Sequence, residues 1–154
     1  MGLRFKYPDK MGIEFPRLAS TDYRITSCPS SSYNCIAWAA EDSERPWWPR
    51  FDEQLKWAGY YWPPGAPEEE TLDAFIRCFE ILGYQVCDNC DCECEYEKVV
   101  IYSKDGSPTH AARQVTHGKW SSKLGPDADI SHEISALDGP LYGSVAVVMR
   151  RKRK

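Results

Sequence analysis

The spacing of the apolar residues changes at Gly83, and this change constrains the fold more than any other feature of the chain. Before Gly83, residues 68–82 carry apolar side chains at helical spacing, with acidic residues in the first turn and a glycine where helices stop. After Gly83, short alternating runs are typical of strands. The sequence therefore predicts helices followed by an antiparallel sheet. The predicted strands are 84–87, 98–102, 109–115, 119–124 and 144–149.

A single domain is expected for residues 1–154, because a chain of this length buries a core without disulfides or metal ions. Residues 1–30 are rich in proline, glycine and polar side chains, and they predict an irregular arm that wraps the domain. Residues 150–154 are all basic and predict a solvated tail. We therefore expect an α+β fold in which N-terminal helices pack on a C-terminal antiparallel sheet.

Charge and cysteine content indicate the environment of the protein. The formal net charge of −4 gives no general attraction to nucleic acid. No apolar run reaches the length of a membrane span, and the N-terminus lacks the apolar core of a signal peptide. Seven cysteines, an odd number, fit a reducing compartment better than a disulfide framework. A cytoplasmic protein without membrane or nucleic-acid partners is expected, and its oligomeric state has no signal in the sequence.

Cys35 is the candidate nucleophile. It follows Ser31 and Ser32, which are good capping residues, and the apolar residues after it predict a buried helix that begins near the thiol. At a helix N-terminus the backbone N–H groups and the helix dipole favour a thiolate. The alternative is that Cys35 is a small buried apolar residue.

His110 is the candidate base, because a thiol nucleophile needs a group that takes its proton. It opens a predicted strand, whereas His117 falls in a turn and His132 in a short polar segment. A three-residue turn at 116–118 puts His110 and Ser122 on one face of the hairpin. Ser122 is therefore the candidate orienting residue.

The identity of the third residue stays open at this point. A two-residue turn would shift the register and place Ser121 on the face of His110. Asp127 and Asp129, which follow the strand, are of a type more often found beside a catalytic imidazole. The backbone N–H of Cys35 and the side chain of Asn34 are candidate donors to an oxyanion.

The order of these residues resembles that of papain-like cysteine enzymes, among them the NlpC/P60 peptidases, transglutaminases and arylamine N-acetyltransferases. It implies a papain-like layout and a thiol-dependent hydrolase or acyltransferase that acts on a peptide, amide or isopeptide bond. An aromatic, proline-rich stretch at 45–65 suits a protein or peptide substrate, either as a binding wall or as cover for the core.

Several short boxes look like those of an uncharacterised bacterial domain family, over residues 30–151. That resemblance implies no particular reaction. The boxes are Tyr-Asn-Cys-Ile-Ala-Trp at 33–38, Tyr-Glu-Lys-Val at 96–99, Thr-His-Ala-Ala-Arg-Gln at 109–114, Trp-Ser-Ser-Lys-Leu-Gly at 120–125 and Tyr-Gly at 142–143.

Four cysteines within eight residues form a second candidate site, at Cys87, Cys90, Cys92 and Cys94. Four thiols match the ligand number of a structural zinc site, and the acidic residues between them would help to hold a cation. Structural zinc sites usually join two distant pairs, however, and these four are crowded. The alternative functions are therefore a metal-binding protein that uses this loop, or a non-catalytic binding module whose aromatic and basic side chains contact a ligand.

Overall fold

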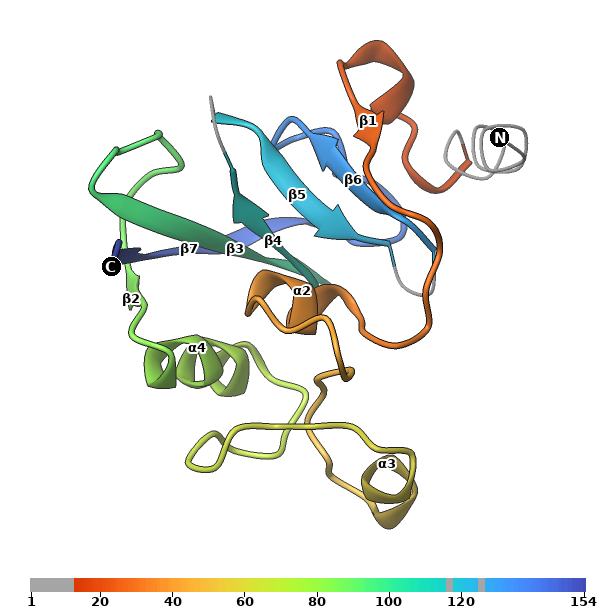
Figure 1. Cartoon of the computed structure of the whole chain (residues 1–154), viewed down its shortest axis with the longest axis vertical. Coiled ribbons are helices and arrows are strands. Elements are labelled where there is room, and N and C mark those ends of the chain that lie inside the picture. The colour runs from red at the N-terminus through yellow and green to blue at the C-terminus, as the bar shows by residue number, and fades with distance from the viewer. Residues whose placement is uncertain (1–12, 116–117, 125–126) are drawn as a thin grey trace.

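A computed structural model describes residues 13–115, 118–124 and 127–154, and these form one seven-stranded sheet (Figure 1). The strand order is β1-β6-β5-β4-β3-β7-β2, and all neighbouring strands run antiparallel. Both edge strands have only two residues, so little unpaired backbone is left for edge-to-edge association. The strands are β1 (Arg24–Ile25), β2 (Gln85–Val86), β3 (Tyr96–Lys104), β4 (Ser107–Gln114), β5 (Trp120–Lys123), β6 (Asp129–His132) and β7 (Ser144–Lys152).

The helices are short. They are α2 (Cys35–Ala39), α3 (Glu53–Trp57) and α4 (Leu72–Ile81), with a 3-10 turn, η1 (Leu18–Ser20), before them. Both α2 and α3 stop after five residues, because Glu41 and Gly59 just beyond them take positive φ angles of 68° and 86°. The helix predicted over 68–82 is confirmed as α4, where the Thr71 hydroxyl accepts a hydrogen bond from the backbone N–H of Ala74.

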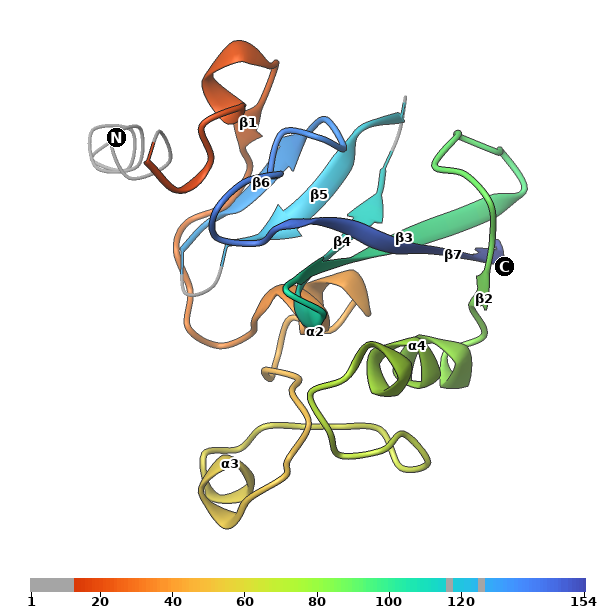
Figure 2. The ribbon, with the colours of Figure 1, turned by 180° about the vertical axis from the view of Figure 1, so that it is seen from behind.

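Each face of the sheet carries its own apolar core, because successive strand residues point to opposite faces. On one face, α2 and α4 pack against β3 and β4, whereas irregular segments cover the other face. Figures 1 and 2 show α2 close to the sheet and α3 farthest from it. The helical face buries Ile36, Phe75, Phe79, Val99 and Ile101, and the other face buries Phe15, Leu18, Val100, Tyr102 and Leu137.

The predicted papain-like α+β layout is wrong. The sheet dominates the fold, it takes β1 from the N-terminal segment, and only α4 among the described α-helices exceeds five residues. The aromatic stretch between α2 and α4 forms turns and a single parallel bridge between Trp47 and Tyr61. Its prolines prevent longer helices, and buried Trp47 and Trp62 make it largely a part of the core.

The five predicted strands are present with shifted ends, and β1 and β6 are additional. The predicted tail of residues 150–154 differs most, because β7 continues to Lys152. Arg150 and Arg151 there pair with Glu93 and Glu97. Residues 1–12 of the predicted arm and His117 lie outside the described residues. None of the helices that the structure describes is long and apolar enough to cross a membrane.

Candidate functional site

Cys35 is the first residue of α2, and Asn34 caps this helix in place of the predicted Ser31 or Ser32. The side-chain oxygen of Asn34 accepts from the backbone N–H groups of Ala37 (3.1 Å) and Trp47 (3.0 Å). Its amide donates to the Trp47 carbonyl (2.8 Å). These three hydrogen bonds join the start of α2 to the backbone of Trp47. The role of Asn34 as an oxyanion donor stays a prediction.

The Cys35 thiol is buried between α2 and β4, with 8% of the residue exposed. Burial raises the pKa of the thiol to about 11, although nearby backbone N–H groups, above all that of Ala111, and the Lys123 ammonium partly oppose the shift. This corrects the expectation of a favoured thiolate. The five-residue helix offers too little stabilisation to offset desolvation, so the thiol is neutral at pH 7.

His110 lies fully buried on β4 and is hydrogen-bonded to Ser122 on β5. The Nε2 atom of His110 is 2.8 Å from the Ser122 hydroxyl oxygen, which is 2.7 Å from Nε2 of His132 on β6. The Nδ1 atom of His132 is 2.7 Å from the backbone carbonyl of Glu133. The structure thus brings the predicted His110 and Ser122 together and adds His132, which lies in a short polar segment without a clear strand pattern.

Both His110 and His132 are neutral. Burial lowers the pKa of His132 to about 4 and that of His110 well below its ordinary value, and repulsion from His132 lowers the latter further. A neutral imidazole has one N–H donor and one acceptor nitrogen. The hydrogen bonds therefore determine which nitrogen carries each proton.

The proton positions follow from the backbone carbonyl of Glu133, which ends this series of hydrogen bonds. Because the Glu133 carbonyl only accepts, Nδ1 of His132 donates to it and Nε2 of His132 accepts from the Ser122 hydroxyl. The Ser122 oxygen then accepts from Nε2–H of His110. Nδ1 of His110 is left with the lone pair, and it is buried without a hydrogen-bond partner among the described residues. His110 is thus a neutral imidazole whose Nδ1 carries no proton.

Two tyrosines hold the His110 ring in place. Tyr142 stacks on it, with ring centroids 4.0 Å apart and planes 10° from parallel. Tyr102 meets it edge-on at 5.2 Å and donates from its hydroxyl to the Ile134 carbonyl (3.0 Å). With Ser122 at one nitrogen and aromatic rings around it, the imidazole has a fixed orientation.

Cys35 and His110 approach the same part of β4 without a hydrogen bond between them in the described part of the chain. Of the backbone N–H groups near the thiol, the one that lowers its pKa most belongs to Ala111, the residue after His110. Strand alternation directs Ala111 toward α2 and His110 toward the aromatic rings of the opposite face. Cys35 is nevertheless within electrostatic reach of Tyr142, the ring stacked on His110. The catalytic pair stays a prediction.

The other candidates for the third residue have other partners. The Ser121 hydroxyl accepts from the indole N–H of Trp38 (2.9 Å). The Asp129 carboxylate accepts from the Tyr33 hydroxyl (2.9 and 3.1 Å). The backbone carbonyl of Asp127 accepts from the ammonium of Lys123. Of the predicted third residues, only Ser122 is hydrogen-bonded to the imidazole in the described ranges.

A lysine organises the loop of four cysteines. The side chain of Lys98 is fully buried, and its ammonium donates to the backbone carbonyl (3.0 Å) and side-chain oxygen (3.1 Å) of Asn89. It is also 2.8 Å from the Glu93 carboxylate. The ammonium therefore supplies the positive charge around which the acidic loop folds.

No group of three or more His, Cys, Asp or Glu side chains in the described residues is arranged to hold a metal ion. Zinc binding stays a prediction without a preformed site. Of the four loop thiols, Cys87 and Cys90 are partly buried, whereas Cys92 and Cys94 are exposed.

We expect Lys98→Met to open this loop, because methionine keeps the length of the buried stem but leaves the oxygens of Asn89 and Glu93 without their donor. Alkylation of Cys87 and Cys90, followed by mass spectrometry, should become about fivefold faster or more, as expected for a segment that opens locally. Lys152→Met, on β7 and exposed, is the control. Unchanged rates in Lys98→Met would show that the loop holds without the ammonium.

The fold is a sheet-dominated domain with a buried histidine–serine–histidine chain beside a buried thiol. Residues 24–150 match a family described as a domain of unknown function, DUF7689, and the chain belongs to this family. No curated protein and no solved structure matches the chain. The match confirms the resemblance to an uncharacterised domain family, and it gives no link to papain-like or NlpC/P60 enzymes.

Proposed function

We propose that the protein is a thiol-dependent hydrolase or acyltransferase that acts on a peptide, amide or isopeptide bond, with Cys35 as nucleophile and His110 as base. The observation that carries this proposal is the buried Nδ1 of His110, which has no hydrogen-bond partner within the described ranges. An unsatisfied buried acceptor costs stability, and such groups concentrate where chemistry needs them. The hydrogen bonds through Ser122 and His132 keep the lone pair on this nitrogen.

The proposed reaction begins from a neutral pair. Burial raises the pKa of the thiol and lowers that of His110, so the proton moves during the attack and no ion pair precedes it. The Cys35 sulfur bonds to the carbonyl carbon as its proton passes to Nδ1 of His110. The carbon–nitrogen bond then breaks, and His110 returns the proton to the departing amine. Water or a second amine finally attacks the thioester carbon as His110 takes its proton, the carbon–sulfur bond breaks, and His110 returns the proton to the Cys35 sulfur.

Substrate binding has to bring the thiol and Nδ1 closer together. Catalytic hydrogen bonds are often long before the substrate is present. The start of α2 is the segment that would move, since Cys35 is its first residue and the helix has only five. A protein or peptide substrate is supported by Phe51 and Trp57, which are 54% and 87% exposed beside the buried aromatics of the same stretch.

Acetylation by p-nitrophenyl acetate, located by mass spectrometry, tests the proposal without knowledge of the substrate. We expect Cys35 to be acetylated faster than Cys78, a buried thiol on α4 whose pKa burial raises to about 12. His110→Gln should slow the reaction at Cys35 by about 100-fold, the lower range of general-base effects. Cys35→Ser should remove the acetyl site.

Ser122→Ala provides a second test if His110→Gln does not fold. Alanine leaves Nε2 of His110 without its acceptor, so the ring loses its preferred tautomer and the acetylation of Cys35 should slow. Circular dichroism establishes that each variant is folded. Equal acetylation rates at Cys35 and Cys78 would refute the proposal. So would an acetylation rate at Cys35 that is unchanged in both His110→Gln and Ser122→Ala.

A non-catalytic binding module is the second candidate. It is favoured by the 8% exposure of Cys35 and by its raised pKa, which are typical of a structural thiol. In this case, Cys35 and Cys78 should be equally slow to acetylate.

A further inference from the structure

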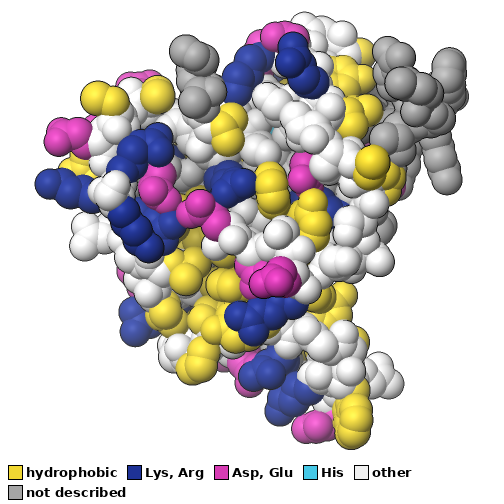
Figure 3. All heavy atoms as spheres, in the orientation of Figure 1, with side chains coloured by type: hydrophobic (Ala, Val, Ile, Leu, Met, Phe, Trp, Pro, Cys, Tyr) yellow, Lys and Arg dark blue, Asp and Glu magenta, His cyan; other side chains and the backbone are white. Residues whose placement is uncertain are grey.

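Lys123 on β5 is a buried cation that the proposed reaction does not use, and lysine is rarely buried unless its ammonium is paired. It is 0% exposed, whereas Figure 3 shows many Lys and Arg side chains on the surface of the molecule. Its ammonium donates to the backbone carbonyls of Ser30 (2.6 Å) and Asp127. It also lies 5.0 Å from the centre of the Tyr33 ring. These contacts place the charge beside the segment that leads into α2.

Lys123 lies on the face of the sheet that α2 covers. Strand β5 pairs with β4 at Ser121 and Arg113, and the Ser121 hydroxyl accepts a hydrogen bond from α2. Because side chains alternate along a strand, Lys123, two residues after Ser121, points to this same face. Ala111, two residues before Arg113, does so too, and its backbone N–H lies near the Cys35 thiol. Lys123 and Cys35 therefore approach the sheet on the same side.

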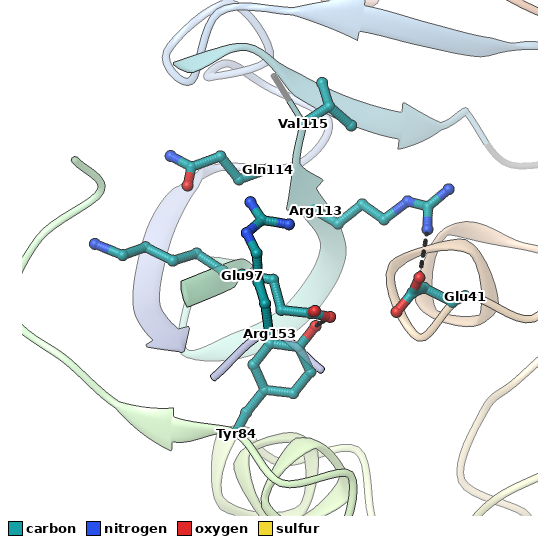
Figure 4. A pocket seen from close by; sticks show the side chains of 8 residues that line it. Glu41, Tyr84, Glu97, Arg113, Gln114, Val115 and Arg153 are labelled. Atoms are coloured by element: carbon teal, nitrogen blue, oxygen red, sulfur yellow. Dashed lines mark hydrogen bonds and ion pairs between the residues drawn. The ribbon is translucent and has the colours of Figure 1, made fainter. Parts of the chain in front are cut away.

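The Lys123 ammonium acts electrostatically on the Cys35 thiol. Burial raises the pKa of this thiol, and the ammonium is among the groups that oppose the shift. Arg113, a second cation on this face, is directed elsewhere. Its terminal nitrogen is 3.4 Å from Glu41 beyond the end of α2, as the dashed line in Figure 4 marks. Because Cys35 is the first residue of α2, Lys123 is the cation at the end of the helix that carries the thiol.

We propose that Lys123 is a positioning residue of the candidate site, and that its ammonium stabilises the negative charge that forms on the Cys35 sulfur as the proton leaves. That charge forms only if Cys35 is the nucleophile, so this role rests on the proposed function. His110 takes the proton from the opposite face of the sheet, where the aromatic rings hold the imidazole. A buried cation acts strongly on the sulfur because little water screens it. Base and cation thus act on the sulfur from different sides.

Alkylation of Cys35 in the full chain by iodoacetate and by iodoacetamide, followed by mass spectrometry, measures this charge. The two reagents are close in size, but only iodoacetate is an anion, so the ratio of their rates reports the charge at the thiol rather than its exposure. At pH 7 the ratio at Cys35 should exceed that of N-acetylcysteine amide, a small neutral reference thiol. Lys123→Gln should lower the ratio by about threefold or more, because glutamine keeps a donor for the Ser30 carbonyl but carries no charge.

Should Lys123→Gln not fold, the unsubstituted chain provides the same test through pH. Burial lowers the pKa of Lys123, so the rate ratio should fall toward that of the reference thiol as the pH rises and the ammonium loses its proton. Asp127 and Asp129 also face the ammonium, but a carboxylate loses its proton in acid. Burial raises the pKa values of Tyr33 and Tyr142, so these groups ionise later than the lysine.

Lys119→Gln is the control, because it removes the charge of a partly exposed lysine that pairs with carboxylates just before β5. It should change the ratio by less than about twofold. A ratio at Cys35 equal to that of the reference thiol would overturn the proposal, and so would equal changes in Lys123→Gln and Lys119→Gln. Neither outcome affects the acetylation test, which compares Cys35 with Cys78 and depends on His110. A ratio that depends on Lys123, together with acetylation that does not depend on His110, would instead contradict the proposed function.

Discussion

Gly143→Ala should lower the free energy of unfolding by about 3 kcal/mol or more, or prevent folding, because it combines backbone strain with a steric clash. Gly143 has a φ angle of 76°, and a Cβ added there would lie 2.0 Å from the Ser103 carbonyl oxygen and 2.8 Å from its carbon. Both contacts are with backbone, so no side-chain rotation relieves them. Ser103 also pairs with both neighbouring strands, with Pro108 on β4 and with Ser144 on β7.

Gly106→Ala is the matched control for this prediction. Gly106 has a φ angle of 84°, and a Cβ there meets nothing within 4 Å. Gly106→Ala should therefore lower the free energy of unfolding only by the backbone strain, about 1–2 kcal/mol. Urea unfolding at pH 7 gives both values. Similar losses in the two variants would mean that β3 moves aside for the new methyl group.

The pairing of His110 with Ser122 is predictable from sequence because it depends on local geometry. The period of two along β4 and β5 and the predicted pairing of Val115 with Lys119 determine which residues share a face, and in the structure the backbone N–H of Val115 donates to the Lys119 carbonyl (2.7 Å). Placing His110 and Ser122 on one face requires only the register of β4 against β5, which the sequence between the two strands predicts. The same reasoning holds for α4, where capping and apolar spacing are both local.

The overall layout and His132 depend on long-range contacts, and there the sequence is insufficient. The order of cysteine, histidine and serine does not determine how helices and strands are layered. Strand β6 has four residues and a single apolar side chain, Ile130, so it carries almost no strand pattern of its own. It is a strand because β5 and β1 pair with it. The raised pKa of Cys35 likewise comes from what covers the thiol, which the helix start does not reveal.

Lowering the pH from 7 to 5 should destabilise the protein by about 2 kcal/mol through His132 alone. Burial lowers the folded-state pKa of His132 to about 4, below the ordinary value of 6.5 expected in the unfolded chain. Between these values the unfolded state binds the proton and the folded state does not. The contribution to stability is therefore complete above pH 6.5 and is lost as the pH falls toward 4. His110 adds a loss of the same sign, because its folded-state pKa is also lowered.

Urea unfolding at pH 7 and pH 5 measures this loss, and His132→Gln isolates it. Glutamine does not titrate, so the variant should lose about 2 kcal/mol less than the original chain over this interval, whatever its stability at pH 7. The pKa of the Asp42 carboxyl is lowered, so this group titrates below the interval and does not disturb the comparison. Equal losses in both chains would mean that His132 is protonated at its ordinary pKa in the folded state.

The same measurement bears on the proposed base. If His132 is neutral, its Nε2 accepts from Ser122, and Nδ1 of His110 keeps its lone pair at pH values well below the ordinary pKa of histidine. Acetylation of Cys35 should then fall in acid only where the protein unfolds, and the two transitions should coincide. If the reaction stops while the chain is still folded, His110 is protonated at a higher pH than its burial implies. The fixed tautomer would then no longer support His110 as the base.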